Sequence, residues 1–397
     1  MAMRLTDRKN ITFAQERRGQ STDASACKQA HHGCGKLHAM EMIDRARYDA
    51  LAAGAEQTGG DARDRRAVAT WLLCCCALLF AMIVVGGVTR LTHSGLSITE
   101  WQPIVGTVPP LSAADWADVF AKYQATPEYR QVNFGMSLDA FKSIFWWEYA
   151  HRVLGRAIGV AFLLPYLWFL ARRRIPRGYA GPLFAIFVLG GAQGALGWYM
   201  VQSGLVDDPR VSQLRLIAHL GLAFLIFGAM FWVILSLYRS RPGSTANAGL
   251  RRFAMALTGL VFLMVLAGGL VAGIRAGFAY NTFPSMNGYW VPPEILMLDP
   301  WYRNFTDNMA TVQFDHRMIG WMLAILVPWF AWRVHVAPHA GSQARRAALL
   351  LLALLIVQIA LGISTLLLFV PLPLAAAHQA GAVLVFAAAL NASHALR

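Results

Sequence analysis

Eight apolar segments, each long enough to cross a lipid bilayer, constrain the fold of this chain more than any other feature. A helix needs roughly 20 apolar residues to span a bilayer core, and within lipid only helices and closed barrels satisfy every backbone polar group. The chain is 57% hydrophobic and only 14% charged, whereas roughly a quarter of a soluble protein's residues are charged. The sequence therefore predicts an all-α membrane protein. Its spans are expected at approximately 68–89, 150–171, 181–201, 214–238, 253–274, 315–335, 347–370 and 373–394.

The formal net charge of +14 would suit a nucleic-acid-binding protein, but the distribution of the basic residues does not. They gather in the N-terminal tail and in the short loops after the second, fourth and sixth spans. Cytoplasmic loops of membrane proteins carry such an excess of Lys and Arg. We therefore predict that both termini are cytoplasmic and that no nucleic acid is bound. The long, weakly charged loops at about 91–147 and 275–312 are predicted to face outward.

The two halves of the chain resemble each other, which predicts an internal duplication of a four-helix unit. Because a unit of four spans starts and ends on the same side, the copies form two parallel-repeat four-helix bundles. We expect a disordered cytoplasmic tail at 1–66, an N-terminal repeat at 67–240 and a C-terminal repeat at 241–397. The matched segments are Gly86-Gly87 with Gly268-Gly269, His151-Arg152 with His316-Arg317, Gln193 to Gly197 with Gln358 to Gly362, and His219 with His378.

Four histidines fall in the apolar segments, at matched positions of the two repeats and near the predicted outer ends of their helices. One intramembrane histidine is as easily a hydrogen-bonded core residue as a functional one. Four in matched pairs favour axial ligation of an iron porphyrin, which helix bundles commonly hold between facing imidazoles. A bare metal site is less well supported, because two imidazoles are a thin ligand set. The predicted pairs are His151 with His219, and His316 with His378.

Glu148 lies three residues before His151, so both side chains share one helix face. A carboxylate there can stabilise a developing cation, move protons or position water, or it can simply pair with Arg152. The second repeat has the neutral Gln313 at the matching position, which cannot do acid–base work. This difference predicts a reaction site in the first repeat and a fixed cofactor in the second. Arg152 and Arg317 could bind porphyrin propionates, or could be interfacial cations.

From about residue 68 onward the chain resembles the haem A synthases of the Cox15/CtaA family. The resemblance rests on Gly86-Gly87-Val88-Thr89-Arg90-Leu91-Thr92-His93-Ser94-Gly95-Leu96-Ser97, Glu100-Trp101, Glu148-x-x-His151-Arg152 and Gln313-x-x-His316-Arg317. It implies oxidation of the C8 methyl of haem O to the formyl group of haem A through a hydroxymethyl intermediate, for cytochrome c oxidase. The chain has no cysteine pairs in its predicted outer loops, so it is similar to the subgroup that lacks them.

The resemblance also implies roles for individual residues. His316 and His378 would ligate one haem b, with Arg317 nearby. His151 and His219 would bracket the iron of the substrate haem O, with Glu148 in the reaction site and Arg152 beside it. The implied location is a bacterial inner membrane with the haem sites near the periplasmic face, or alternatively the mitochondrial inner membrane. Candidate partners are haem O synthase, oxidase assembly factors and further copies of the chain, while the electron acceptor stays open.

Two other functions share parts of this pattern. A di-haem b-type electron-transfer protein would use the same four histidines, but it would not need a glutamate in one repeat alone. A transporter with parallel repeats could use histidines to relay protons, but it would have helices broken near the bilayer midplane. Here the segments run on continuously, with Pro165 and Pro328 as expected kinks.

Overall fold

The computed structural model describes residues 61–102, 105–239, 248–338 and 340–397. Within these ranges it is helical and contains eight helices long and apolar enough to span a membrane, which confirms the predicted class. The part of the tail expected to be disordered that lies at 1–60 is outside the described residues. The spans are Asp61–Leu91, α4 (Leu138–Ala171), α5 (Ala180–Gln202), α6 (Gln213–Tyr238), α7 (Ala248–Gly273), α9 (Met309–Val336), α10 (Ser342–Leu367) and α11 (Leu372–Ala395).

Several helices begin earlier than hydropathy predicts, and the difference is largest for the first span and α4. The first span is already helical at Asp61, the first described residue, so residues 61–66 are helical and not part of a disordered tail. Asp64 accepts a 2.7 Å ion pair from Arg174, which ties this extra turn to the end of α4. The start of α4 lies at Leu138 instead of residue 150, with Ser137 accepting a capping hydrogen bond from the amide of Ala140.

The extension of α4 is stabilised by the first outer loop, which is itself largely helical. Phe141 and Phe145 of α4 are buried against Tyr123 of α2 (Ala113–Gln124), in an aromatic cluster that also takes in Trp116. A capping box between Ser112 and Asp115 begins α2. The short helix α3 (Pro127–Gln131) follows, and it brings Glu128 into the interior, where its exposed fraction is 5%. Hydropathy alone does not find these elements because their aromatic and polar residues alternate.

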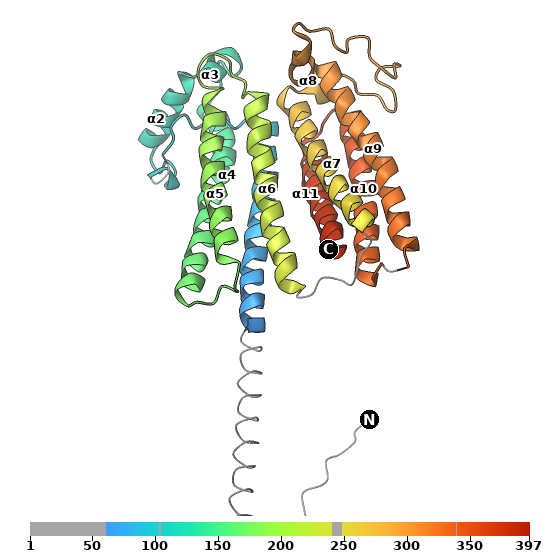
Figure 1. The fold of residues 1–397 in the computed structure, drawn as a ribbon. Helices are drawn as coiled ribbons and strands as arrows, with labels where there is room; N and C mark the ends of the chain where they lie inside the picture. Colours follow the sequence, from blue (N-terminus) through green and yellow to red (C-terminus); the bar gives the residue numbers. More distant parts are fainter. Residues whose placement is uncertain (1–60, 103–104, 240–247, 339) are drawn as a thin grey trace, which may run out of the picture. The chain divides into compact units, whose positions relative to one another are not determined.

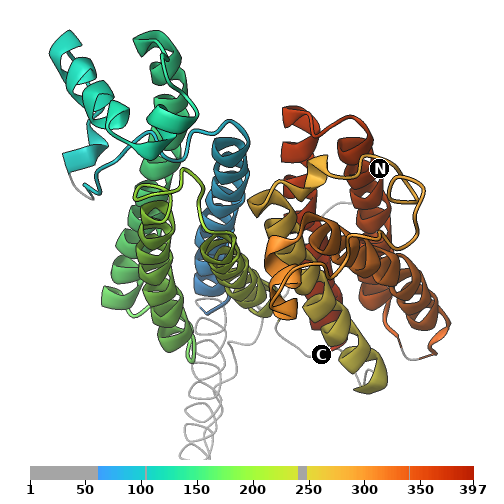
Figure 2. The ribbon, with the colours of Figure 1, turned by 90° about the horizontal axis from the view of Figure 1, so that it is seen from above.

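The helices form two groups of four. In Figures 1 and 2 the first span, α4, α5 and α6 lie together, beside a second group of α7, α9, α10 and α11. The groups meet where α6 packs on α7 and α11. The side chain of Gln379 on α11 donates to the carbonyl of Ile83 at 2.6 Å, and Arg90 donates to that of Gly273 at 3.0 Å. The repeat boundaries at 67–240 and 241–397 stay a prediction that this grouping supports.

Glycines allow the close approach of helices where the groups meet. A Cβ atom on Gly87 would collide with the side chain of Gln379, and one on Gly269 would lie 3.0 Å from Ile217 of α6. Both α4 and α9 run through their internal prolines, Pro165 and Pro328, as single helices. This continuity disfavours the transporter alternative, in which broken helices form the site.

The second outer loop is built from short turns. It contains η2 (Ala276–Phe278), η3 (Trp301–Arg303) and α8 (Asn304–Asp307). Asn304 is fully buried and both donates to and accepts from the backbone of Leu298 at 2.9 Å. These bonds fix the loop next to the beginning of α9, the helix that carries His316.

Replacing Phe224 of α6 by Ala should lower the free energy of unfolding by about 3–5 kcal/mol, as large-to-small changes at buried aromatic positions do. Phe224 is 1% exposed and meets Phe386 of α11 edge to face, with the ring centroids 5.6 Å apart. The measurement is thermal unfolding in detergent. Phe184→Ala on α5 is the control, because that ring is 55% exposed. Equal melting temperatures for the two variants would contradict this account of the contact between the groups.

Candidate functional site

The structure brings the four intramembrane histidines together in the predicted pairs. His151 on α4 lies close enough to His219 on α6 to interact electrostatically, and His316 on α9 has the same relation to His378 on α11. Three of the four stand in the second or third turn of their helices. His151 is deeper in its helix only because α4 extends outward to Leu138. Each pair therefore lies at one level, near the predicted outer end of its helix group.

Each of the four imidazoles rests against a glycine. A Cβ atom placed on Gly86 would lie 3.0 Å from Nε2 of His151, and one on Gly268 would lie 3.3 Å from Cε1 of His316. These two glycines are 182 residues apart, at the same position of the two repeats.

The other two histidines have the same kind of neighbour on a different helix. A Cβ atom on Gly197 of α5 would come within 2.8 Å of Cε1 of His219. One on Gly362 of α10 would come within 2.8 Å of Cε1 of His378. A side chain at any of these positions would push the imidazole away, so the glycines set where each ring lies.

The imidazoles are not held by hydrogen bonds of the kind that a structural core histidine makes. Among the described residues, the side chains of His151, His316 and His378 make no hydrogen bond, and His219 has only a 3.5 Å contact with the Gln193 amide. The Nδ1 atoms of His219, His316 and His378 are buried without a partner. Buried polar atoms are normally satisfied, so unpaired nitrogens indicate that something outside the chain completes them.

The helix carrying the second histidine of each pair is anchored in the same way in both groups. Gln193 of α5 donates from Nε2 to the carbonyl of His219 at 3.0 Å. Gln358 of α10 donates to the carbonyl of His378 at 2.8 Å. Each glutamine thus fixes the backbone of a histidine, while the glycine four residues further along fixes its ring. The matched Gln-to-Gly segments are visible in the sequence, but the sequence does not show that they position the histidines.

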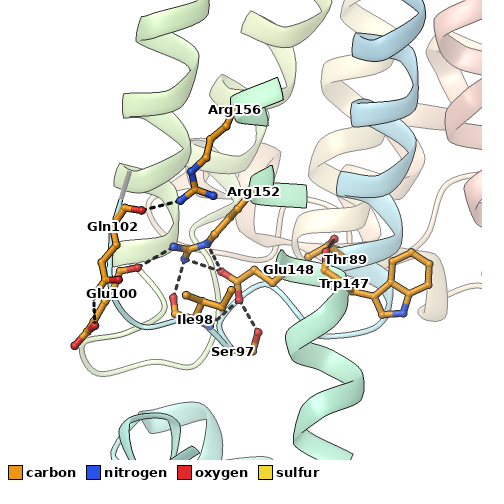
Figure 3. A network of polar contacts seen from close by, with 9 residues as sticks. All are labelled: Thr89, Ser97, Ile98, Glu100, Gln102, Trp147, Glu148, Arg152 and Arg156. Atoms are coloured by element: carbon orange, nitrogen blue, oxygen red, sulfur yellow. Dashed lines mark hydrogen bonds and ion pairs between the residues drawn. The ribbon is translucent and has the colours of Figure 1, made fainter. Parts of the chain in front are cut away.

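Glu148 is buried, with an exposed fraction of 2%, and its carboxylate holds the first outer loop on α4 (Figure 3). Oε1 accepts two bonds from the Arg152 guanidinium, at 2.7 and 3.0 Å. Oε2 accepts from the Ser97 hydroxyl at 2.7 Å and from the amide of Ile98 at 2.8 Å. A carboxylate has about four lone-pair positions, so this one is fully used. The structural alternative for Glu148 is a salt bridge to Arg152 or to Lys142. The ion pair with Arg152 is present, whereas Lys142 pairs with Asp139 at 3.0 Å.

Arg152 also holds the first outer loop, and we call Glu148 and Arg152 together with their loop contacts the clamp. Its guanidinium donates to the carbonyls of Ile98 at 2.7 Å and Glu100 at 2.8 Å, besides the carboxylate of Glu148. One turn further, Arg156 donates to the carbonyl of Gln102 at 2.7 Å. Arginines of α4 therefore hold the stretch of the first outer loop from Ile98 to Gln102. The hydropathy pattern does not reveal the Ser97 and Ile98 contacts, because they depend on the fold of this loop.

The second helix group contains a neutral version of the same clamp. Gln313 is 3% exposed and donates from Nε2 to the carbonyl of Tyr280 at 3.1 Å. Arg317 donates to that same carbonyl at 3.0 Å and to the carbonyl of Ser285 at 3.2 Å. Tyr280 follows Ile98 by the repeat distance of 182 residues. Both clamps thus hold the same loop position, but only the first contains a carboxylate. Propionate binding by Arg152 and Arg317 stays a prediction, since loop carbonyls occupy their donors.

Comparison with known proteins places the chain in a family. The model of the COX15-CtaA family, described as cytochrome oxidase assembly protein, matches residues 69–390. The chain belongs to this family. Three relatives are named Heme A synthase. The protein of Nitrosospira multiformis is 63% identical over 84% of this chain and 94% of its own length. That of Nitrosomonas eutropha is 58% identical over 81% and 92%, and that of Parvibaculum lavamentivorans 47% identical over 84% and 95%.

The matched region of the COX15-CtaA family contains both histidine pairs and both clamps. It also contains the glycines that contact the imidazoles. The described residues include no group of three or more His, Cys, Asp or Glu side chains that could hold a bare metal ion. Two facing imidazoles without further protein ligands suit a porphyrin iron, which brings its own four equatorial nitrogens. The residues present therefore fit a haem at each pair better than a bare cation.

Replacing Gly362 by Ala should displace the ring of His378 and weaken haem binding in the second group. A loss of about 1.4 kcal/mol corresponds to about tenfold lower affinity, and we expect a loss of at least that size. The measurement is haem b per purified chain, from the absorption spectrum. Gly197→Ala should retain haem b, because it acts on His219. Gly194→Ala should be silent, because no atom lies within 4 Å of its added Cβ. Wild-type haem b content in the Gly362 variant would refute the role of this contact.

Replacing Glu148 by Gln should loosen the first outer loop as well as remove a charge. An amide nitrogen would face donor groups of Arg152, Ser97 or Ile98, and a mismatched buried bond costs about 1–3 kcal/mol. The expected result is a lower melting temperature and faster proteolysis within residues 97–102. Asp139→Asn on the same helix is the control, because its exposed ion pair with Lys142 is worth about 0–1 kcal/mol. A Glu148 variant that matches this control would mean that the clamp does not hold the loop.

Proposed function

We propose that this chain is a haem A synthase, an oxidoreductase of the membrane that converts haem O to haem A for cytochrome c oxidase. Its place in the COX15-CtaA family and the name shared by its relatives support the reaction. The observation that carries the proposal is the pair of buried imidazoles in each helix group, every one seated on a glycine and three of them with an unpaired Nδ1 atom. As the resemblance implies, the C8 methyl group is oxidised through a hydroxymethyl intermediate to a formyl group.

The second helix group is proposed to hold one resident haem b. His316 and His378 would hold it, and when bound it would supply one-electron transfer. Gln313 and Arg317 keep the loop at Tyr280 folded over this group, with an amide in the place that Glu148 has in the first group. Gly268 and Gly362 fix the two rings against their helices. A fixed frame suits a cofactor that remains bound between turnovers.

The first helix group is proposed to take the substrate. His151 and His219 would contact the iron of haem O from opposite sides. Glu148 lies one turn from His151 on the same helix and carries a negative charge where the second group has the neutral Gln313. Because its oxygens accept four hydrogen bonds, we assign it a fixed electrostatic and positioning role next to the substrate. Ser97, Ile98 and Arg152 hold that charge in place.

The location follows from the same reasoning. The chain is a multi-pass membrane protein, and its bacterial relatives support a bacterial inner membrane. With the basic loops inside, the histidine ends of the helices face the periplasm. The proposed partners are haem O, haem A and lipid. Contacts with haem O synthase, oxidase assembly factors or further copies of the chain stay proposals.

The decisive experiment is identification of the bound porphyrins. The chain is produced together with a supply of haem O and purified in detergent, and its haems are extracted and separated by chromatography with mass detection. Haem b together with haem O, its hydroxylated form or haem A supports the proposal. Two haem b per chain and no other porphyrin would instead identify a di-haem electron-transfer protein.

Single histidine variants should separate the two sites. His316→Ala and His378→Ala are expected to lose haem b, because each removes one of two axial ligands. His151→Ala and His219→Ala should keep haem b but lose bound haem O and haem A formation. The measurement is the ratio of the extracted haems. His335→Ala, at the other end of α9, is the control and should keep both. Full haem b content in both second-group variants would overturn the ligand assignment.

A further inference from the structure

A second buried carboxylate lies on the outer side of the first helix group, at a site for which the proposed function has no use so far. Glu128 of α3 is 5% exposed, although an isolated carboxylate is costly to bury. Among the described residues its side chain accepts one long hydrogen bond, 3.4 Å from the hydroxyl of Tyr123. Tyr123 is fully buried and in turn accepts from the amide of Asn133 at 2.7 Å. Unlike Glu148, Glu128 therefore has carboxylate lone pairs that accept no hydrogen bond from the described residues.

Glu128 lines a cavity of about 420 Å³ that opens to the outer side between the loops. The cavity joins three parts of the chain that are distant in sequence: the end of the first span, α3 and the loop after α5. Arg275, from the second helix group, closes it and donates to Nδ1 of His93 at 3.0 Å. The other lining residues are Gln131, Val132, Asp207, Asp208, Pro209 and Arg210.

The same carboxylate lies within electrostatic range of the reaction site. Glu128 and Glu148 are close enough to interact, and Tyr123 interacts with both. The loop after the first span contributes two buried hydroxyl groups, of Ser94 and Ser97, and Ser97 donates directly to Glu148. Glu128 thus combines a position near Glu148 with access to the cavity, as a proton-exchange group would.

Burial, together with repulsion from Glu148, raises the pKa of Glu128 to about 7. The guanidinium groups of Arg90 and Arg275 act in the opposite direction but do not cancel these effects. Of the other charged groups that line the cavity, Asp208 binds Arg210 at 2.9 Å and His93 accepts from Arg275, while Asp207 adds a further carboxylate whose main-chain carbonyl accepts from Gln131. Glu128 is therefore protonated below about pH 7 and ionised above it, where it can accept a proton.

We propose that Glu128 is the outer proton-exchange residue of this enzyme, taking protons released near Glu148 and passing them to solvent through the cavity. With water as the source of the oxygen, oxidation of the methyl group to an alcohol takes up one water molecule and releases two protons and two electrons. Oxidation of the alcohol to an aldehyde releases two more protons and two more electrons, and in both steps the electrons pass to a one-electron acceptor. Glu148 cannot carry the protons while its four acceptor positions bind Arg152, Ser97 and Ile98. In each transfer Glu128 gains a proton on its free carboxylate oxygen and gives it to water in the cavity. The inference rests on the proposed function.

The test compares haem A formation by wild-type and Glu128→Gln chains in isolated membranes supplied with haem O, across a range of pH around 7. The wild-type rate should rise with pH through about 7, because only the ionised carboxylate accepts a proton. In the glutamine variant the rate should fall about tenfold or more, since acid–base groups contribute typically 10²–10⁴-fold, and the rise with pH should disappear. Glu128→Asp should retain much of the rate. Asp118→Asn, an exposed carboxylate of the same outer loop, should be indistinguishable from wild type.

Haem content distinguishes this role from a structural one. The glutamine variant should carry haem b and haem O at wild-type levels, so that only turnover changes. If it turns over haem O with the wild-type rate and pH profile, the proposal is wrong. If the wild type itself forms no haem A, the proposed function fails instead. If Glu128→Gln loses its haems, the aspartate variant decides: a wild-type pH profile there would overturn the proposal, whereas a displaced profile would support it.

Thermal stability gives an independent readout that needs no turnover. An acid whose pKa is raised on folding stabilises the protein below its unfolded pKa, and the contribution is lost as pH rises through the folded value. The wild type should therefore lose stability relative to Glu128→Gln between about pH 4.5 and 7. A constant difference across this range would mean that Glu128 does not titrate there, and would overturn the proposal.

Discussion

The contact between an imidazole edge and a bare glycine backbone is the constraint on which the site depends. In each helix group a histidine of one helix is seated on a glycine of another, so ring position and helix spacing are set together. Among the described residues, Nδ1 of His219, His316 and His378 is buried without a hydrogen-bond partner. In a helix bundle without a bound ligand this arrangement is unfavourable, because unsatisfied polar atoms in an apolar interior are costly. It becomes favourable once the nitrogens bind a group that the chain does not contain.

A second constraint comes from the outer loops, which close each helix group at the level of its histidines. The loop carbonyls at Ile98 and Tyr280 are held by arginines at equivalent places, so the two groups share one construction. The exchange of Gln313 for Glu148 then changes the charge without changing the fold. In the second group the glutamine donates to the loop, and in the first the glutamate accepts from it. Two helix groups of one construction can in this way differ in chemistry.

The charged clamp also limits what Glu148 can do. A carboxylate that accepts four hydrogen bonds is a fixed charge. Adding a proton to it would break at least one of its hydrogen bonds to Arg152 or to the loop. Proton release then needs another group with free lone pairs and access to water. Glu128, brought into the interior by the short helix α3, has both properties. Fixed charge and proton exchange are thereby separated between two neighbouring carboxylates.

The sequence by itself determined the eight spans, the matched histidines and the difference between Glu148 and Gln313, because hydropathy, repetition and residue type are local properties. It placed the glycines at 86, 197, 268 and 362 without indicating that they contact the histidines. Only the tertiary structure decided the loop clamp, the extension of α4 to Leu138 and the burial of Glu128. These features depend on contacts between residues that lie far apart in the chain. Local sequence patterns do not reveal these contacts, because a buried carboxylate and an exposed one in a polar loop have similar neighbours in the sequence.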